Sequence, residues 1–310
     1  MNILTLNTYK QSCFGDFTQA PEVENFLLGC RILAVSQILN TFPVSSLRLF
    51  LKNPRLPGSE QFLFDHIPRT GGTYFASILA QLLGSTSENI DCGPNYAKEH
   101  LDEIERLDRY RVIVGHLRLD TVKAFQRRRP RHLISLVRDP VEQIVSTYTF
   151  WRYNVTQDLW HCNLAKDLSF SDFIRRRDLR MAVDNPLTRH FFGLWSIDGF
   201  DVSDTTKALA SRMADSYAFI GVTERMEDNV NAFRRQFRTR PVQIDLASHD
   251  RNASKGAIQI SDEDRRYLWD RNQLDYTLYA HVNRRLDEAL GLGYYSYTLA
   301  TEMPGFATLR

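Results

Sequence analysis

The sequence is poor in features that mark several large protein classes. Its four cysteines are widely spaced and form neither a metal-binding motif nor a disulfide framework, which favours a reducing compartment. Lys and Arg number 39 against 37 Asp and Glu, and a net charge of +2 at pH 7 is too small to predict a nucleic-acid partner. The glycine pair Gly71-Gly72 also lacks the Gly-x-x-x-x-Gly-Lys-Ser/Thr spacing of ordinary P-loop kinases and ATPases. The cysteines are Cys13, Cys30, Cys92 and Cys162.

Long apolar runs are missing as well. Residues 1–17 lack the basic start and continuous apolar core of a signal peptide. The apolar stretch 26–39 is short for a bilayer span and contains Arg31 and Gln37, so we read residues 21–40 as a helix. We therefore expect a soluble cytoplasmic protein with no transmembrane segment.

The remaining composition fits one large folded domain. The chain has 310 residues, of which 43% are hydrophobic and 25% charged, enough to bury a sizeable core. Short apolar runs suited to buried strands alternate with amphipathic stretches suited to helices. We predict a P-loop-like three-layer α/β/α fold with a central, mostly parallel sheet. The predicted strands are 62–67, 111–115, 132–137, 217–222 and 242–246, and the predicted helices are 74–83, 96–107, 140–152, 224–237 and 261–291.

Proline and glycine pairs divide the chain. Asn53-Pro54 and Pro57-Gly58 mark a linker, so the main domain is expected to begin near Glu60. Residues 153–212 are rich in aromatic side chains and mixed in character, and they are expected to form helices and loops of a lid or acceptor-binding wall. The predicted parts are 1–59, an N-terminal helical extension and linker; 60–295, the main domain, with 153–212 as the lid or wall; and 296–310, a C-terminal tail.

The stretch 61–83 joins an apolar strand, a tight turn and an amphipathic helix. Pro68 ends the strand, and Gly71 and Gly72 allow positive φ and leave no side chain between an anion and the backbone. Thr70 and Thr73 offer hydroxyl groups where the helix begins. A helix N-terminus carries partial positive charge and free N–H groups, so this layout predicts a phosphate or sulfate site.

The segment from Ile67 to Thr73, IPRTGGT, resembles the 5′-phosphosulfate-binding loop of the Golgi-type carbohydrate sulfotransferases, a group that includes the heparan sulfate 2-O- and 6-O-sulfotransferases and related bacterial enzymes. That loop usually reads Pro-Lys-Thr-Gly, and Arg69 replaces its lysine here. The resemblance implies that residues 60–295 form a sulfotransferase domain and that Arg69 acts on the transferring group. It implies nucleotide binding by Arg69, Thr70, Gly71, Gly72, Thr73 and Tyr74.

Two later segments resemble the parts of that family that bind the 3′-phosphate. Arg138-Asp139-Pro140 stands at the end of a predicted strand, and Ser146 follows eight residues after the arginine. Arginine gives a forked, permanently charged donor suited to phosphate. Arg251 and Lys255 lie in RNASKG, which resembles the family's basic loop over the 3′-phosphate and adenine, although an ordinary polar turn has nearly the same pattern.

His116, at the end of a predicted strand, resembles the general base of the 2-O-sulfotransferases. Imidazole suits that task because its pKa lies near neutrality. Asp120 and His66 are runner-up bases, and the alternation of side chains along the strand favours a core role for His66. Because the carboxyl ends of parallel strands share one edge of a sheet, we expect Arg69, His116 and Arg138 to converge there.

The resemblance implies transfer of a sulfuryl group from 3′-phosphoadenylyl sulfate (PAPS) to a hydroxyl group, with 3′-phosphoadenosine 5′-phosphate (PAP) as product, no metal, and a carbohydrate acceptor in a bacterial protein. An atypical ATP-dependent kinase and a catalytically inactive glycan-binding module remain alternatives. Oligomeric state is not indicated by the sequence. An acidic acceptor has candidate partners in the arginine-rich stretches, although such runs are usually solvated surface. These are Arg118, Arg127 to Arg129, Arg131 and Arg175 to Arg177.

Overall fold

The computed structural model describes residues 60–84, 86–91, 101–193, 202–239, 244 and 258–292. The predicted helix over 21–40, the loop that contains Arg251 and Lys255, and the tail 296–310 lie outside these residues.

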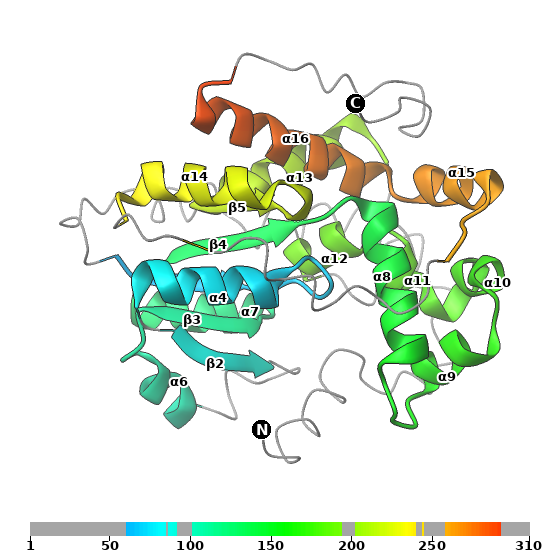
Figure 1. The fold of residues 1–310 in the computed structure, drawn as a ribbon, viewed down its shortest axis with the longest axis horizontal. Coiled ribbons are helices and arrows are strands. Elements are labelled where there is room, and N and C mark those ends of the chain that lie inside the picture. The colour runs from blue at the N-terminus through cyan, green and yellow to red at the C-terminus, as the bar shows by residue number, and fades with distance from the viewer. Residues whose placement is uncertain are drawn as a thin grey trace.

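A parallel sheet forms the centre of the described fold (Figure 1). Its five strands have the order β2-β3-β1-β4-β5, and every neighbouring pair is parallel. At the end of β1, Asp65 is in register with Gly115 on one side and Ser135 on the other. The predicted mostly parallel sheet is therefore confirmed. The strands are β1 (Phe62–Asp65), β2 (Thr86–Asp91), β3 (Val112–His116), β4 (His132–Val137) and β5 (Phe219–Val222).

Three of the strands predicted from apolar runs are buried along their length, whereas the predicted strand 242–246 lies outside the described residues except for residue 244. Every residue of β1, β3 and β5 is buried, as expected when helices cover both faces of a sheet. The sequence TSENID of β2 was not predicted as a strand because it is polar and lies at the edge of the sheet. Ser87 explains part of that polarity, since its hydroxyl accepts a hydrogen bond from the Val114 backbone N–H at 3.0 Å.

Helices form a layer on each face of the sheet. On one face, α4 (Gly72–Leu83) and α14 (Met226–Phe237) pack their aromatic side chains on β1. Phe62 contacts Phe233 with ring centroids 5.5 Å apart, and Phe64 contacts Phe75 at 5.5 Å. The opposite face is covered by α7 (Leu119–Arg128), α12 (Pro186–Phe192) and α13 (Asp204–Asp215). The predicted three-layer α/β/α arrangement is confirmed.

A second hydrophobic cluster lies beside the sheet, around α8 (Pro140–Tyr153) (Figure 1). It contains Tyr148 and Trp151 from α8 and Phe173 from α10. Within the predicted stretch 153–212, the first helices belong to this cluster, whereas α12 and α13 belong to the core of the sheet. The remaining elements are α6 (Leu101–Leu107), α9 (Trp160–Asp167), α10 (Phe170–Arg175), η1 (Arg177–Leu179), α11 (Arg180–Val183), η2 (Thr223–Arg225), α15 (Asp262–Arg271) and α16 (Gln273–Leu290).

The single helix predicted over 261–291 is wrong, because Asn272 divides it into α15 and α16. The Asn272 side chain accepts a hydrogen bond from the Asn185 backbone N–H at 2.8 Å and donates to the carbonyl groups of Val183 and Leu268. These contacts connect the break to the start of α12, 87 residues earlier in the chain. The apolar periodicity carries no information about such a contact.

Buried polar contacts fix the start of α12. The carboxylate of Asp275, on α16, accepts hydrogen bonds from the backbone N–H groups of Leu187 and Thr188 at 2.8 and 2.7 Å, and from the Thr188 hydroxyl at 2.6 Å. Asp275 therefore satisfies N–H groups that the first turn of a helix leaves without partners. Through this carboxylate, α16 positions the helix that carries His190.

We predict that replacing Asp275 with Asn lowers the free energy of unfolding at pH 7 by about 1–3 kcal/mol, because an amide cannot accept all three bonds. Burial raises the pKa of Asp275 to about 6. Between its ordinary pKa and about 6, the folded state binds more protons than the unfolded state, so this carboxyl makes stability fall as pH rises through that window. Urea denaturation from pH 4 to 7 is expected to show a weaker fall in the variant.

Asp139, whose pKa is also raised to about 6, contributes to the same window, so part of the pH dependence should remain. Asp262→Asn, at an exposed position of α15, is the matched control and should leave the profile unchanged. Identical profiles for wild type and Asp275→Asn would contradict the prediction.

Candidate functional site

The turn between β1 and α4 requires both of its glycines. Gly71 has φ of +74°, in the left-handed region, and a Cβ at Gly72 would lie 2.0 Å from Cδ2 of His66. The His66 ring is buried, stacks against Phe64 and has Nδ1 3.3 Å from Oδ1 of Asn89. Burial lowers the pKa of His66 to about 3, and the neighbouring His116 acts in the same direction. A neutral His66 thus packs beneath the turn, as the alternation of side chains predicted.

The turn is also held by hydrogen bonds from other segments. The Thr70 hydroxyl donates to the Ile67 carbonyl at 2.9 Å, so its proton serves the turn itself. The Thr223 hydroxyl lies 2.6 Å from the Thr70 carbonyl oxygen and 2.9 Å from that of Val137, and it joins the turn to the end of β4. Gln143 donates to the Pro68 carbonyl at 3.0 Å. The backbone of the turn is therefore fixed before any ligand arrives.

The first turn of α4 carries backbone donors that no group of the helix accepts. The backbone N–H groups of Gly72 and Thr73 have no acceptor within the helix, as at any helix start. Thr73 is exposed and Tyr74 is half-buried. The sequence predicts a phosphate cradle at these groups.

Arg69 connects the cradle to α8. Its Nε donates to the Ser146 hydroxyl at 3.1 Å, and its guanidinium carbon lies 4.4 Å from the centre of the Phe150 ring. Arg138, just after β4, donates through Nη1 to the Arg69 carbonyl at 3.3 Å. The structure therefore brings the two predicted binding motifs into direct contact, with two guanidinium groups beside the start of α4.

Acidic groups surround the start of α8. Asp139 caps the helix by accepting a hydrogen bond from the Glu142 N–H at 3.0 Å. Burial raises the pKa of Asp139 to about 6, and the carboxylate of Glu224 adds to that effect. Glu224 accepts from the Asp139 N–H at 3.1 Å and lies 3.9 Å from Nε of Arg138. The sequence predicted only the start of a helix at Glu224, whereas in the structure its carboxylate lies 3.9 Å from Nε of Arg138.

His116 ends β3 at the same edge of the sheet. Its ring centre lies 4.6 Å from that of His66, and its Nδ1 lies 3.4 Å from Oδ1 of Asp91. The His116 side chain is 5% exposed. Asp120, a runner-up base, is exposed on the first turn of α7. The sequence did not point to Asp91 as a site residue, because the polar strand β2 that carries it was not predicted.

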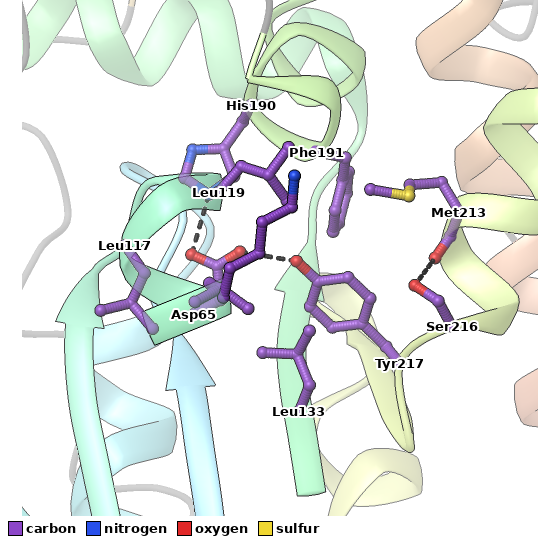
Figure 2. Close-up of a pocket in the computed structure, with 11 residues that line it drawn as sticks. Asp65, Leu117, Leu119, Leu133, His190, Phe191, Met213, Ser216 and Tyr217 are labelled. Atoms are coloured by element: carbon purple, nitrogen blue, oxygen red, sulfur yellow. Dashed lines mark hydrogen bonds and ion pairs between the residues drawn. The ribbon is translucent and has the colours of Figure 1, made fainter. Parts of the chain in front are cut away.

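A small cavity lies on the other face of the sheet (Figure 2). Its volume is about 50 Å³, far below the roughly 300 Å³ at which ligand pockets begin. Figure 2 shows His190 and Tyr217 directed at Asp65, and both lie 2.8 Å from its carboxylate oxygens. Burial raises the pKa of Tyr217 well above its usual value, so the phenol remains a donor. This cluster holds the end of β1 in place.

Most of the arginines considered for an acidic acceptor have structural partners. Arg131 is buried and donates to the backbone of Asp108 and Tyr110. Arg128 pairs with Glu105 and Asp108. Both arginines precede β4 and therefore lie at the edge of the sheet opposite His116. Arg175 pairs with Glu263 and Asp264, and Arg176 with Asp178. Arg128, Arg131 and Arg175 are therefore all engaged within the described chain, and a role in binding an acidic acceptor stays a prediction.

Comparison with known proteins shows the family to which this chain belongs. A model described as "Sulfotransferase family" matches residues 56–281. The chain belongs to the sulfotransferase family. A stretch of 122 residues is 31% identical to the Arabidopsis thaliana "Protein-tyrosine sulfotransferase" and covers 39% of this chain and 23% of that relative. The chain is also similar to the mouse sulfotransferase SULT7A1 complexed with PAP, with a TM-score of 0.32 and 16% identity over 77% of this chain and 91% of the mouse chain.

The described residues lack two kinds of structure. They contain no group of three or more His, Cys, Asp or Glu side chains arranged to hold a metal ion. Within the same residues, no helix has the length and apolar character needed to cross a membrane.

We predict that Gly72→Ala lowers the free energy of unfolding by about 1–3 kcal/mol, because the new methyl group overlaps the His66 ring. Urea denaturation measures the loss. Gly84→Ala is the matched control at the other end of α4: its φ of +83° costs about 1 kcal/mol, but nothing lies within 4 Å of the new Cβ.

The double variant His66→Ala/Gly72→Ala distinguishes the overlap from a general intolerance of the turn. Removing the ring makes room for the methyl group, so the penalty for Gly72→Ala should shrink in the His66→Ala background. Additive penalties would show that the close approach of His66 is not the reason for the glycine.

Proposed function

We propose that this chain transfers a sulfuryl group from PAPS to a hydroxyl group of a carbohydrate and releases PAP. The convergence of the α4 amides, Arg69, Arg138 and His116 at one sheet edge carries the proposal. The amides of Gly71 to Thr73 and Arg69 would hold the 5′-phosphosulfate, and Arg138 and Ser146 the 3′-phosphate. Both phosphates of this nucleotide belong to one ribose, which suits two motifs that touch through Arg69 and Ser146. The family match supports the same reaction.

The side chains have distinct roles in this transfer. His116 accepts the proton of the acceptor hydroxyl as its oxygen forms a bond to sulfur. Arg69 and the amides at the start of α4 stabilise the charge that grows on the 5′-phosphate oxygen as its bond to sulfur breaks. Catalysis is then positioning plus charge stabilisation along an in-line path, as in phosphoryl transfer.

The guanidinium of Arg69 has a geometry that a lysine lacks. Its planar fork presents several donors at once, so Nε can remain on Ser146 while the terminal nitrogens address an oxyanion. A single residue thereby links the two binding motifs.

One face of α8 supports a carbohydrate acceptor. Ser146, Phe150 and Tyr153 follow one another at helical spacing, so they share a face that leads away from the nucleotide site. Tyr153 is 54% exposed, and Trp160 at the start of α9 is 41% exposed. Exposed aromatic rings with a polar edge are surfaces on which sugar rings stack. The plant relative is named for a tyrosine acceptor, so a phenol is the comparison substrate for the test.

We predict that Arg138→Ala weakens PAP binding about 10- to 100-fold, measured by calorimetry, because a charge-assisted contact to phosphate is lost. Arg128→Ala is the matched control, since that arginine pairs with Glu105 and Asp108 at the opposite edge of the sheet. Equal loss of affinity in both variants, or no PAP binding by the wild type, would overturn the proposed site.

Transfer itself is tested with radiolabelled PAPS, a panel of desulfated polysaccharides and a tyrosine-containing acidic peptide. We expect sulfation of a polysaccharide and a loss of about 10²- to 10⁴-fold in kcat for His116→Ala, with PAP affinity retained. PAP binding without transfer to any acceptor would contradict the enzyme proposal, and transfer to the peptide alone would replace the carbohydrate with a phenol.

For the acceptor surface, we predict that Tyr153→Ala and Trp160→Ala each raise the KM for the polysaccharide about five- to tenfold and leave PAP affinity unchanged. Leu292→Ala serves as the control, because Leu292 is 44% exposed and lies beyond the end of α16. An unchanged KM in both aromatic variants would place the acceptor elsewhere.

A further inference from the structure

Asp91 and His116 are neighbours across the edge of the sheet. Asp91 ends β2, His116 ends β3, and the two are in register as parallel partners. Oδ1 of Asp91 lies 3.4 Å from Nδ1 of His116, and the two side chains are 10% and 5% exposed. The contact thus joins a carboxylate and an imidazole with little access to water.

Gly115 allows β2 to come this close. A Cβ at Gly115 would lie 2.4 Å from Cγ1 of Ile90 and 2.7 Å from the Ile90 carbonyl oxygen. Any side chain at Gly115 would therefore push the end of β2 away and take the Asp91 carboxylate with it. The Gly-His pair in the sequence gives His116 both its position and its neighbour.

The groups around His116 leave one clear role for the carboxylate. His66, the residue after β1, lies beside His116 and, with a pKa of about 3, adds no positive charge near neutrality. Asn89, also on β2, is engaged by Nδ1 of His66. Neither carboxylate oxygen of Asp91 receives a hydrogen bond within the described chain. A buried carboxylate without a donor is costly, and an N–H at Nδ1 of His116 would remove that cost.

We propose that Asp91 is a positioning residue that accepts the Nδ1–H of His116 and keeps Nε2 unprotonated. The hydroxyl proton then moves to Nε2, and the carboxylate stabilises the imidazolium that forms, which is the logic of an oriented histidine base. The consequence for catalysis rests on the proposed function, whereas the tautomer assignment does not depend on it.

The test begins with a measurement that does not depend on transfer. In ¹H–¹⁵N spectra of the histidine rings, assigned with His116→Gln, wild-type His116 is expected as the Nδ1–H tautomer. Asp91→Asn keeps the shape of the side chain but offers an amide donor to Nδ1, so the spectrum should move toward the Nε2–H tautomer. Asp120→Asn, at an exposed position of α7, should leave the spectrum unchanged.

The kinetic arm uses the same variants. Asp91→Asn is expected to lower kcat on the order of 100-fold with little change in KM or PAP affinity, because the wrong nitrogen carries the proton. Asp91→Glu, which restores a carboxylate, should recover part of the loss and return the ring to the Nδ1–H form.

The outcomes separate the two claims. An Nε2–H tautomer in the wild type, or a tautomer unaffected by Asp91→Asn, would overturn the role of Asp91 whatever the activity. Full transfer by His116→Ala would overturn the base assigned in the proposed function, while the tautomer data would still decide whether Asp91 orients the ring. The wild-type spectrum keeps the test decisive even where Asp91→Asn fails to fold.

Discussion

The end of β1 is held from both faces of the sheet, and the geometry of the site depends on that constraint. On one face, the Asp65 carboxylate lies 2.8 Å from both His190 and the Tyr217 hydroxyl. On the other face, the next side chain, His66, packs against Gly72 so closely that no Cβ fits there. Because successive side chains of a strand point to opposite faces, two adjacent residues fix the strand end from both sides. The turn that follows therefore begins from one defined position.

A chain of polar contacts extends this constraint across the molecule. Asp275 on α16 fixes the start of α12, and His190 near the end of α12 contacts Asp65. Thr223 after β5 bonds to the turn carbonyl of Thr70. The turn before α4 therefore depends on residues far later in the chain, since His190 lies 125 positions after Asp65 and Thr223 lies 153 positions after Thr70. Substitutions in α16 or after β5 are therefore expected to alter the geometry of the site through these contacts, even at positions that contact no ligand.

The sequence predicted those parts of the fold that have a local signal. The apolar runs of β1, β3 and β4, the glycine turn, and Pro140 at the start of α8 each correspond to structure that a few neighbouring residues determine. The polar strand β2 had no such signal, and Asp91 was lost with it. Contacts between distant residues were equally hidden: Asp65 meets His190 and Tyr217 across 125 and 152 residues. Convergence at one edge was predictable only because parallel strands share their carboxyl ends.

Arg69 combines a strained backbone conformation with a position between the two predicted binding motifs. Its φ of +67° places an ordinary residue in the left-handed region, at a cost of about 1–2 kcal/mol. The surrounding contacts hold it there: Arg138 bonds to its carbonyl group, Ser146 to its Nε, and Phe150 lies under its guanidinium. A glycine would relieve the strain but would remove the charge, and a lysine could not reach Ser146 with a forked donor. Under the proposed function, the strain is explained by the position of the guanidinium between the two predicted binding motifs.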